Sequence, residues 1–313
     1  MKRARHRLSL ILGLIAVLAP VSPQADAASQ PSPKVKTISL GFISKRPQAE
    51  VEPQFRDFVD YVARKLSSES AIEGRVVVTP SALQLAKLLE EKKVDFYTDS
   101  PYPTYLVNKQ GAARLLVRRW RGGMAEYHGI LFTKRDGGAT RLEELRGKVI
   151  AFEDPGSTSG HFLPKVFLLR KGFRLAEKPG AEAKVAPREI GYIFTYSTNK
   201  IVDLVLSGKV AAGAFSNDDY SRLDEKGKAE ISILAETETF PRNLVSIRKD
   251  LDPTVARRLK EILLAMHQDE EGRKILEKFD KTTKFDLLPD GEEAVRRKLV
   301  DLFRAREKTA TPR

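Results

Sequence analysis

The sequence predicts an α/β protein of two successive units, each built of strands that alternate with helices. The chain has 313 residues, which is enough for about two domains at roughly 150 residues each. Its composition, 41% hydrophobic and 31% charged, is that of an ordinary globular protein. Short apolar runs alternate with segments of helical periodicity in two consecutive stretches, and this alternation is typical of mostly parallel sheets with helices on both faces.

The first unit begins after a short polar leader. Apolar residues from Phe55 to Leu66 recur at helical spacing, whereas the run Val76 to Val78 is β-branched and predicts a strand. The strands expected here are 35–43, 76–78, 94–97 and 114–120. The helices expected here are 55–66, 83–89 and a segment that begins near 101–103.

The second unit repeats the pattern, and helices dominate after it. A strand at 127–133 leaves the first unit. Asp252 followed by Pro253 is typical of a helix start. The further strands expected are 148–152, 192–196, 210–215, 231–235 and 244–247. The helices expected are 142–145, a segment that ends near 171, 200–206, 218–225, 253–266, 269–279 and 290–303.

The N-terminus has the features of a secretory signal peptide. Four basic residues precede the apolar run 8–19, and Ala25 and Ala27 supply small residues for cleavage after Ala27. An uncleaved anchor is the alternative, but the run is shorter than the roughly 20 apolar residues that span a bilayer. Removal of residues 1–27 leaves 51 basic and 41 acidic residues, a formal charge of +10. This charge suits an anionic ligand, a membrane surface or nucleic acid, and in an exported protein nucleic acid is the weakest of the three.

The sequence contains no cysteine, which excludes disulfides, thiolate metal sites and a cysteine nucleophile. A lipid-anchored exported protein would need a cysteine just after its signal. We therefore expect a freely diffusing protein in a Gram-negative periplasm. The four histidines are scattered without metal-ligand spacing, so we expect no metal and no other cofactor.

The strongest local signal is the segment 152–160, which joins a predicted strand to a predicted helix. Ser157, Thr158 and Ser159 stand beside two glycines, and Pro164 requires regular helix to begin only shortly before it. Hydroxyls and free N–H groups at a helix start favour an oxyanion site. Plain N-capping is the alternative, although it needs only one hydroxyl. The segment nearly matches the nucleophile elbow of hydrolases, but Thr158 replaces the serine and the acid and histidine partners are undefined.

Two other helix starts follow predicted strands. Ser100 follows one strand of the first unit, and Thr198 and Asn199 follow one of the second unit. Ligands of open α/β sheets bind outside the carboxyl ends of the strands. We therefore expect these three residues to lie near the loop 157–159, although each could be an ordinary cap.

Four further positions have two interpretations each. Arg46 follows the first strand and either supplies positive charge to the site or is a solvated loop residue. Tyr105 either lines the site or belongs to a half-buried core. Asp218 either holds a ligand ammonium or caps a helix, and capping is favoured. The segment 118–121 mixes basic and aromatic residues as nucleic-acid sites do, but a strand end with solvated arginines is favoured.

The segment 142–164 resembles the corresponding segment of the phosphate, phosphite and phosphonate class of periplasmic substrate-binding proteins of ABC transporters. The resemblance covers roughly residues 36–280 in order. It implies a type II periplasmic-binding fold with two lobes, two hinge strands and a ligand cleft between the lobes. It also implies that Ser157, Thr158 and Ser159 grip the oxyanion and that Tyr105 is a cleft tyrosine. Weaker matching stretches are residues 40–42, 95–105, 127–130 and 199–214.

Two departures from this family leave the ligand open among phosphate, phosphite, phosphonate and another oxyanion. Asn199 stands where phosphonate binders usually have a histidine, and Asp99 and Ser100 stand where many members have Gly-Pro. On the resemblance, we expect the first lobe at 36–132 and 243–289 and the second at 133–242. A C-terminal helix and tail would follow at 290–313.

The expected function is that of a monomeric, non-enzymatic binding component of an importer. Its partners would be a small anion and a membrane permease, with no nucleic acid. A soluble sensor of the same fold that signals to a membrane kinase is the alternative, and a periplasmic hydrolase that uses the loop 157–159 is a weaker one.

Overall fold

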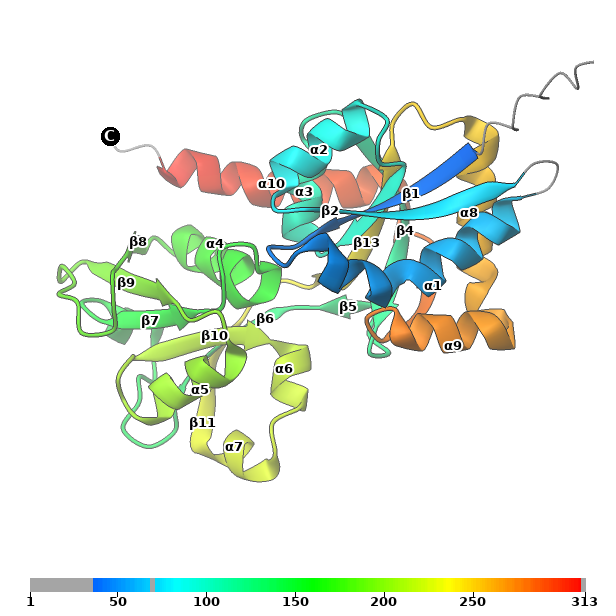
Figure 1. The fold of residues 1–313 in the computed structure, drawn as a ribbon. Helices are drawn as coiled ribbons and strands as arrows, with labels where there is room; N and C mark the ends of the chain where they lie inside the picture. Colours follow the sequence, from blue (N-terminus) through cyan, green and yellow to red (C-terminus); the bar gives the residue numbers. More distant parts are fainter. Residues whose placement is uncertain (1–35, 68–70, 311–313) are drawn as a thin grey trace, which may run out of the picture. The chain divides into compact units, whose positions relative to one another are not determined.

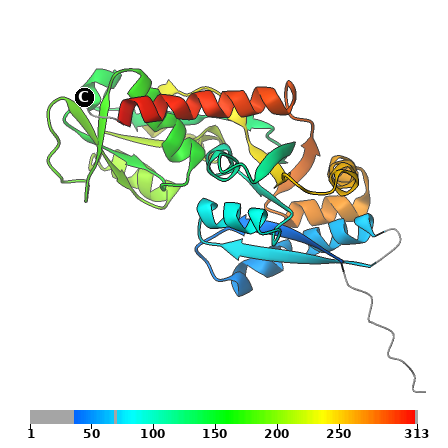
Figure 2. The same ribbon diagram turned by 90° about the horizontal axis from the view of Figure 1, so that it is seen from above.

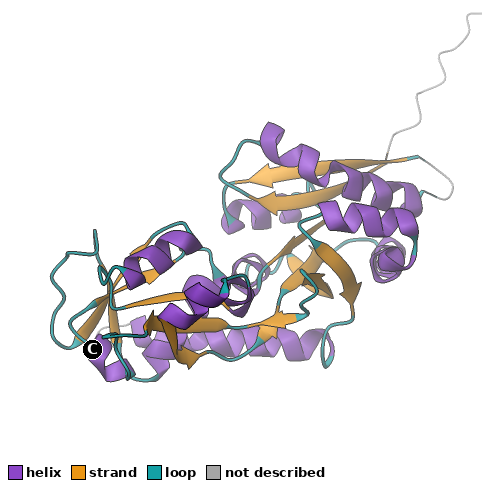
Figure 3. Ribbon diagram, turned by 90° about the horizontal axis from the view of Figure 1, so that it is seen from below, coloured by secondary structure: helices purple, strands orange, loops and turns teal. Residues whose placement is uncertain are grey.

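The computed structural model describes residues 36–67 and 71–310, which form two six-stranded sheets and one two-stranded sheet (Figure 1). The predicted signal peptide, its cleavage site after Ala27 and the tail 311–313 lie outside the described residues. The predicted α/β class is confirmed, with helices on both faces of the large sheets (Figure 3). Within the described part of the chain, no helix is both long and apolar enough to cross a membrane.

The first sheet is mixed, with strand order β14-β4-β13-β3-β1-β2. Its parallel strands are β1 (Lys36–Ile43), β2 (Ile72–Thr79) and β3 (Phe96–Asp99), whereas β4 (Ala113–Arg121), β13 (Asn243–Arg248) and β14 (Thr282–Asp286) pair antiparallel. The prediction of a mostly parallel sheet is therefore wrong here. The chain leaves for the second sheet after β4 and returns along β13, so these neighbours run in opposite directions. The apolar pattern of the sequence also does not predict β14, because only one of its five side chains is apolar.

Helices cover both faces of this first sheet. Apolar residues of α1 (Gln48–Leu66), α8 (Pro253–Ala265) and α9 (Glu270–Lys278) share one core with β1 and β2. On the other face, α2 (Ala82–Glu90) and α3 (Pro101–Asn108) pack over β3. As the sequence predicts, Asp252 caps α8 by accepting hydrogen bonds from the N–H groups of Thr254 at 2.8 Å and Val255 at 3.1 Å.

The second sheet has strand order β11-β6-β10-β7-β9-β8. Residues in β6 alternate between two cores, since Ile130 and Phe132 pack on the side of α5 (Thr198–Leu206) and Leu131 packs on the side of α4 (Leu163–Arg170). The short helices are η1 (Leu142–Leu145), η2 (Thr158–Phe162), α6 (Asn217–Ser221), α7 (Glu225–Glu230) and η3 (Met266–Gln268). The strands are β6 (Gly129–Lys134), β7 (Val149–Phe152), β8 (Arg174–Glu177), β9 (Glu189–Phe194), β10 (Ala212–Ser216) and β11 (Ile231–Glu236).

Two short antiparallel strands, β5 (Glu126–Tyr127) and β12 (Phe240–Pro241), join the two large sheets. The strand β6 pairs with β10 and β11 of the second sheet, so the boundary expected between residues 132 and 133 falls inside a strand. The boundary expected between residues 242 and 243 falls directly before β13. By sheet membership, the first crossing therefore lies a few residues earlier in the chain than expected.

The C-terminal helix α10 (Gly291–Ala310) lies alongside α4, and it also contacts α3 and β4 (Figure 2). Its buried Phe303 stacks on Tyr105 at 3.6 Å and on Phe162 at 4.2 Å between ring centroids, and Phe162 stacks on Tyr102 at 4.4 Å. We call Tyr102, Tyr105, Phe162 and Phe303 the aromatic cluster. It joins α3 of the first sheet to the start of α4 in the second.

Candidate functional site

A cavity of about 380 Å³, here called the oxyanion cavity, lies at the carboxyl ends of β3, β7 and β10. Residues of the crossing segments around β5 and β12 complete its wall. This is the position at which open α/β sheets bind ligands. Ser100, Ser157, Thr158 and Ser159 all line this cavity, so the structure brings four of the predicted site residues together.

The loop after β7 is fixed by its own hydrogen bonds. The Ser157 hydroxyl accepts from Gly160 N at 3.0 Å and donates to a Glu153 carboxylate oxygen at 2.7 Å. Gly160 leaves room for this bond, because a Cβ at this position would lie 2.8 Å from Glu153 Cβ. The π turn η2 follows, and regular helix begins at Leu163, as Pro164 predicts.

Thr158 links the two large sheets. It is 1% exposed, accepts a hydrogen bond from Tyr102 N at 2.9 Å and donates to Ser100 Oγ at 2.9 Å. The Ser159 hydroxyl, by contrast, bonds to none of the other residues that the structure describes. Thr158 and Ser159 are the first two residues of the π turn, so their N–H groups have no acceptor within that turn. The loop therefore offers one hydroxyl and two backbone donors without breaking an existing contact.

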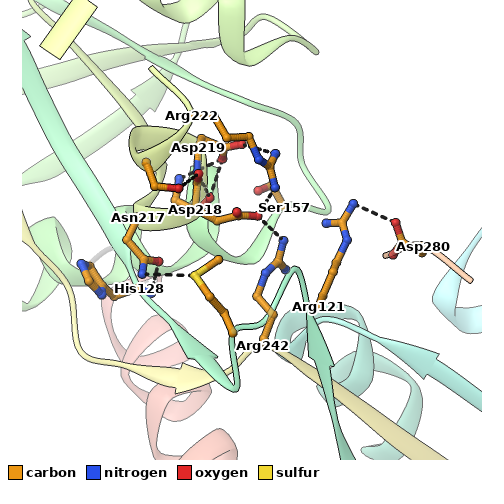
Figure 4. Close-up of polar contacts among 12 residues, drawn as sticks. Arg121, His128, Ser157, Asn217, Asp218, Asp219, Arg222, Arg242 and Asp280 are labelled. Carbon is orange, nitrogen blue, oxygen red and sulfur yellow. Dashed lines mark hydrogen bonds and ion pairs between the residues drawn. The ribbon is translucent and has the colours of Figure 1, made fainter. Parts of the chain in front are cut away.

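Two arginines of β4 reach the cavity from the first sheet. Asp280 accepts from Arg119 Nη2 at 3.0 Å. It also forms an ion pair with Arg121 at 2.8 Å (Figure 4). Arg119 is 3% exposed, and its Nε meets no acceptor among the described residues. The interpretation of segment 118–121 as solvated is thus wrong for Arg119. Arg119 is buried because β14 pairs with β4 at this edge of the first sheet, and the turn before β14 supplies Asp280.

Two more arginines share one carboxylate beside the cavity. Asp218 Oδ2 accepts from Arg242 Nη2 at 3.3 Å and also pairs with Arg222 (Figure 4). The Arg242 guanidinium lies 4.4 Å from the centroid of the Tyr127 ring, and its Nε also lacks an acceptor within the described chain. Asp218 is outside the cavity lining, and it does not cap the helix. The cap is formed by Ser216 and Asp219, which exchange hydrogen bonds across the first turn of α6.

Acidic residues balance these arginines. Burial raises the pKa of Asp99 to about 6, although Ser100 N–H and the Arg119 charge oppose the shift. Burial likewise raises the pKa of Glu153, opposed by the hydrogen bond from Ser157. Asp154, Asp219 and Asp280 also line the cavity. The site is consequently not a plain basic patch, and its net charge changes when Asp99 takes up a proton.

The remaining predicted residues are not part of the lining of this cavity. Tyr105 belongs to the aromatic cluster, which is the core alternative. Thr198 is half-buried and Asn199 exposed in the first turn of α5, whose cap is Ser197. Arg46 is exposed, bonds to Gln54 at 3.4 Å and lines a neighbouring cavity.

Sequence reasoning missed the most charged part of the site. Arg242 stands alone after Phe-Pro, and no local pattern marks it. The one usable signal was the alternation of arginines in β4, since Arg119 and Arg121 must share a face of the strand. Among the described residues, no cluster of three acidic or histidine side chains is placed to hold a metal ion.

The chain is similar to proteins of known structure over most of its length. A sequence model of the family described as ABC transporter, phosphonate, periplasmic substrate-binding protein matches residues 40–290. XAC2383 from Xanthomonas citri bound to ATP is 28% identical, covers 88% of this chain and 98% of its own, and has a TM-score of 0.77. The same protein bound to chloride ion is 29% identical, with coverages of 87% and 98% and the same TM-score. PhnD1 from Prochlorococcus marinus in complex with methylphosphonate shares the fold at 16% identity, a TM-score of 0.60 and coverages of 87% and 99%.

Proposed function

Because this chain belongs to the family of periplasmic phosphonate-type substrate-binding proteins of ABC transporters, we propose that it captures a small oxyanion in the oxyanion cavity. It then presents the bound form to a membrane permease. The observation that carries this proposal is the convergence of the Ser159 hydroxyl, two free loop N–H groups and four arginines on one cavity. Oxyanions are bound by such sets of preorganised donors. The protein acts as a periplasmic monomer and by binding alone.

The loop and the arginines have separate roles in this proposal. The loop N–H groups and the Ser159 hydroxyl donate to the oxygens of the anion. Arg121 and Arg222 supply charge, since each is more exposed than the buried Arg119 and Arg242. The ligands named for the structurally similar proteins support this class, because chloride, ATP and methylphosphonate are all anions.

Calorimetric titration of the mature protein with methylphosphonate, phosphite, phosphate and sulfate tests the proposal. We expect at least one of them to bind and, at 100 times its Kd, to stabilise the protein by about 2.7 kcal/mol. The Ser159→Ala variant should bind about tenfold more weakly with an unchanged melting temperature, because the Ser159 hydroxyl has no partner among the described residues.

Ser207→Ala is the matched control, since that exposed serine bonds only locally, to Leu204 O at 3.3 Å. It should leave both affinity and melting temperature unchanged. The proposal would be refuted if none of the four anions, at millimolar concentration, binds or raises the melting temperature. Equal affinity of the Ser159→Ala variant would remove this hydroxyl from the site.

A further inference from the structure

A second cavity, of about 400 Å³, opens directly beside the oxyanion cavity. We call it the side cavity. The two share Ile43, Pro103, Asp154 and Gly156 as walls, so the side cavity adjoins the oxyanion cavity. The remaining walls of the side cavity include apolar side chains and rings, in contrast to the charged lining of its neighbour. A ligand held in one cavity can therefore reach into the other.

Tyr196 is the most unusual residue of the side cavity. Its side chain is 65% exposed, and its backbone has a φ of 58°, which is uncommon for a residue other than glycine. Its N–H donates to Glu153 O at 2.7 Å, so the strained backbone is tied to the loop of the oxyanion cavity. The fold thus holds an exposed aromatic ring at the edge of the site at a cost in backbone energy.

The wall contributed by the part of the chain around the first sheet includes Leu106 and Pro103, both half-buried. Lys45 stands over the ring of Tyr196, with Nζ 5.7 Å from the ring centroid. A ring between an exposed tyrosine and aliphatic side chains gains both apolar burial and stacking. Methylphosphonate or phosphate has no group that fills this space. The two cavities together fit a ligand with a charged head and a flat apolar substituent.

We propose that the ligand is an organic oxyanion with an aromatic substituent, namely an aryl phosphonate or an aryl or heteroaryl phosphate monoester. This inference rests on the proposed function above. The oxyanion head lies on the loop 157–159, and the ring enters the side cavity between Tyr196 and Leu106. Lys45 covers the mouth and pairs with any second anionic group of the ligand.

Calorimetric titrations with phenylphosphonate and methylphosphonate test this proposal, because the two probes share the head group and differ in the ring. We expect phenylphosphonate to bind at least tenfold more tightly, which corresponds to about 1.4 kcal/mol. The Tyr196→Asn variant should lose most of that preference and keep its affinity for methylphosphonate. Asparagine tolerates a positive φ, so the loop should keep its conformation.

Two further variants separate the ring from other effects. Tyr196→Phe keeps the ring and should keep the preference, whereas Leu83→Ala alters an exposed apolar residue outside the side cavity and should change nothing. Binding of methylphosphonate with no preference for the phenyl compound would overturn this inference and leave the proposed function intact. A preference that persists in the Tyr196→Asn variant would also overturn it. Failure of both probes to bind would refute both proposals.

Discussion

The two large sheets are joined by two kinds of contact that differ in chemistry. At the oxyanion cavity the contacts are polar, with Thr158 bonded to Ser100 and Arg242 paired with Asp218. At α10 the contact is the aromatic cluster, which is held by apolar burial and stacking. Water or a ligand can replace a polar partner at little net cost, whereas nothing in water replaces a stacked ring. We therefore expect the aromatic cluster to contribute more to the stability of the contact between the sheets than the polar contacts at the cavity do.

The largest effect is expected from breaking the aromatic cluster. Phe303 is 3% exposed and stacks on rings of α3 and of the segment before α4. Phe303→Ala should therefore lower the free energy of unfolding by about 3–5 kcal/mol, through lost burial and the cavity left behind. Chemical denaturation monitored by circular dichroism measures this loss.

A surface change on the same helix is the control. Arg296→Ala removes an exposed ion pair with Glu293 and should leave the denaturation midpoint unchanged. If Phe303→Ala is as mild as Arg296→Ala, the aromatic cluster does not hold the sheets together.

The next largest effect is expected at Asp218, where stability and binding should move in opposite directions. Asp218→Asn leaves the buried Arg242 without a charged partner and should lower the free energy of unfolding by about 3 kcal/mol. Because Arg222 loses the same partner, the potential in the cavity becomes more positive. Affinity for sulfate should rise severalfold in calorimetric titration. A fall in both stability and affinity would mean that Asp218 positions the arginines for the ligand.

The loop 157–159 and the charged groups around it differ in how well the sequence predicts them. The position of Ser157, Thr158 and Ser159 follows from a local pattern, because a strand, a glycine-rich turn and Pro164 lie within a dozen residues of one another. The fold class follows for the same reason, since alternation of apolar runs is a local property.

The charged groups follow from no such pattern. Arg119 pairs with Asp280, which lies far along the chain in the turn before β14. The sequence does not predict β14, because this strand contains one apolar residue. Tyr105 faces α10, and the sequence does not specify where that helix packs. Partners brought together by tertiary structure decide which charges are buried, so single-sequence patterns predict the loop and miss its counter-charges.

A smaller loss of stability is expected when the polar contact itself is cut. Thr158→Ala leaves the buried Tyr102 N–H without its acceptor and removes the bond to Ser100. The expected destabilisation of the free protein is about 2 kcal/mol. Thr158→Ser keeps the hydroxyl and should recover most of this stability in thermal melts. If both variants melt like the unmodified protein, the contact between Thr158 and Ser100 is not formed in solution.

The smallest effect concerns the charge of Asp99, whose pKa burial raises to about 6 in the free protein. A bound anion raises this pKa further, since like charges disfavour ionisation, so binding takes up a proton. Affinity is therefore highest below the pKa of the free protein, about 6, falls as the pH rises above it, and levels off above the pKa of the complex. Sulfate keeps its charge throughout this range, so its affinity should fall about tenfold between pH 5.5 and 8, which corresponds to about 1.4 kcal/mol. Asp99→Asn should bind at pH 8 as tightly as the unmodified protein binds at pH 5.5.

Glu153 also has a pKa raised by burial, so Glu153→Gln tests whether part of the pH dependence belongs to that group. A pH profile that Asp99→Asn leaves unchanged would assign the proton to Glu153, and a flat profile in the unmodified protein would show that neither carboxyl faces the anion.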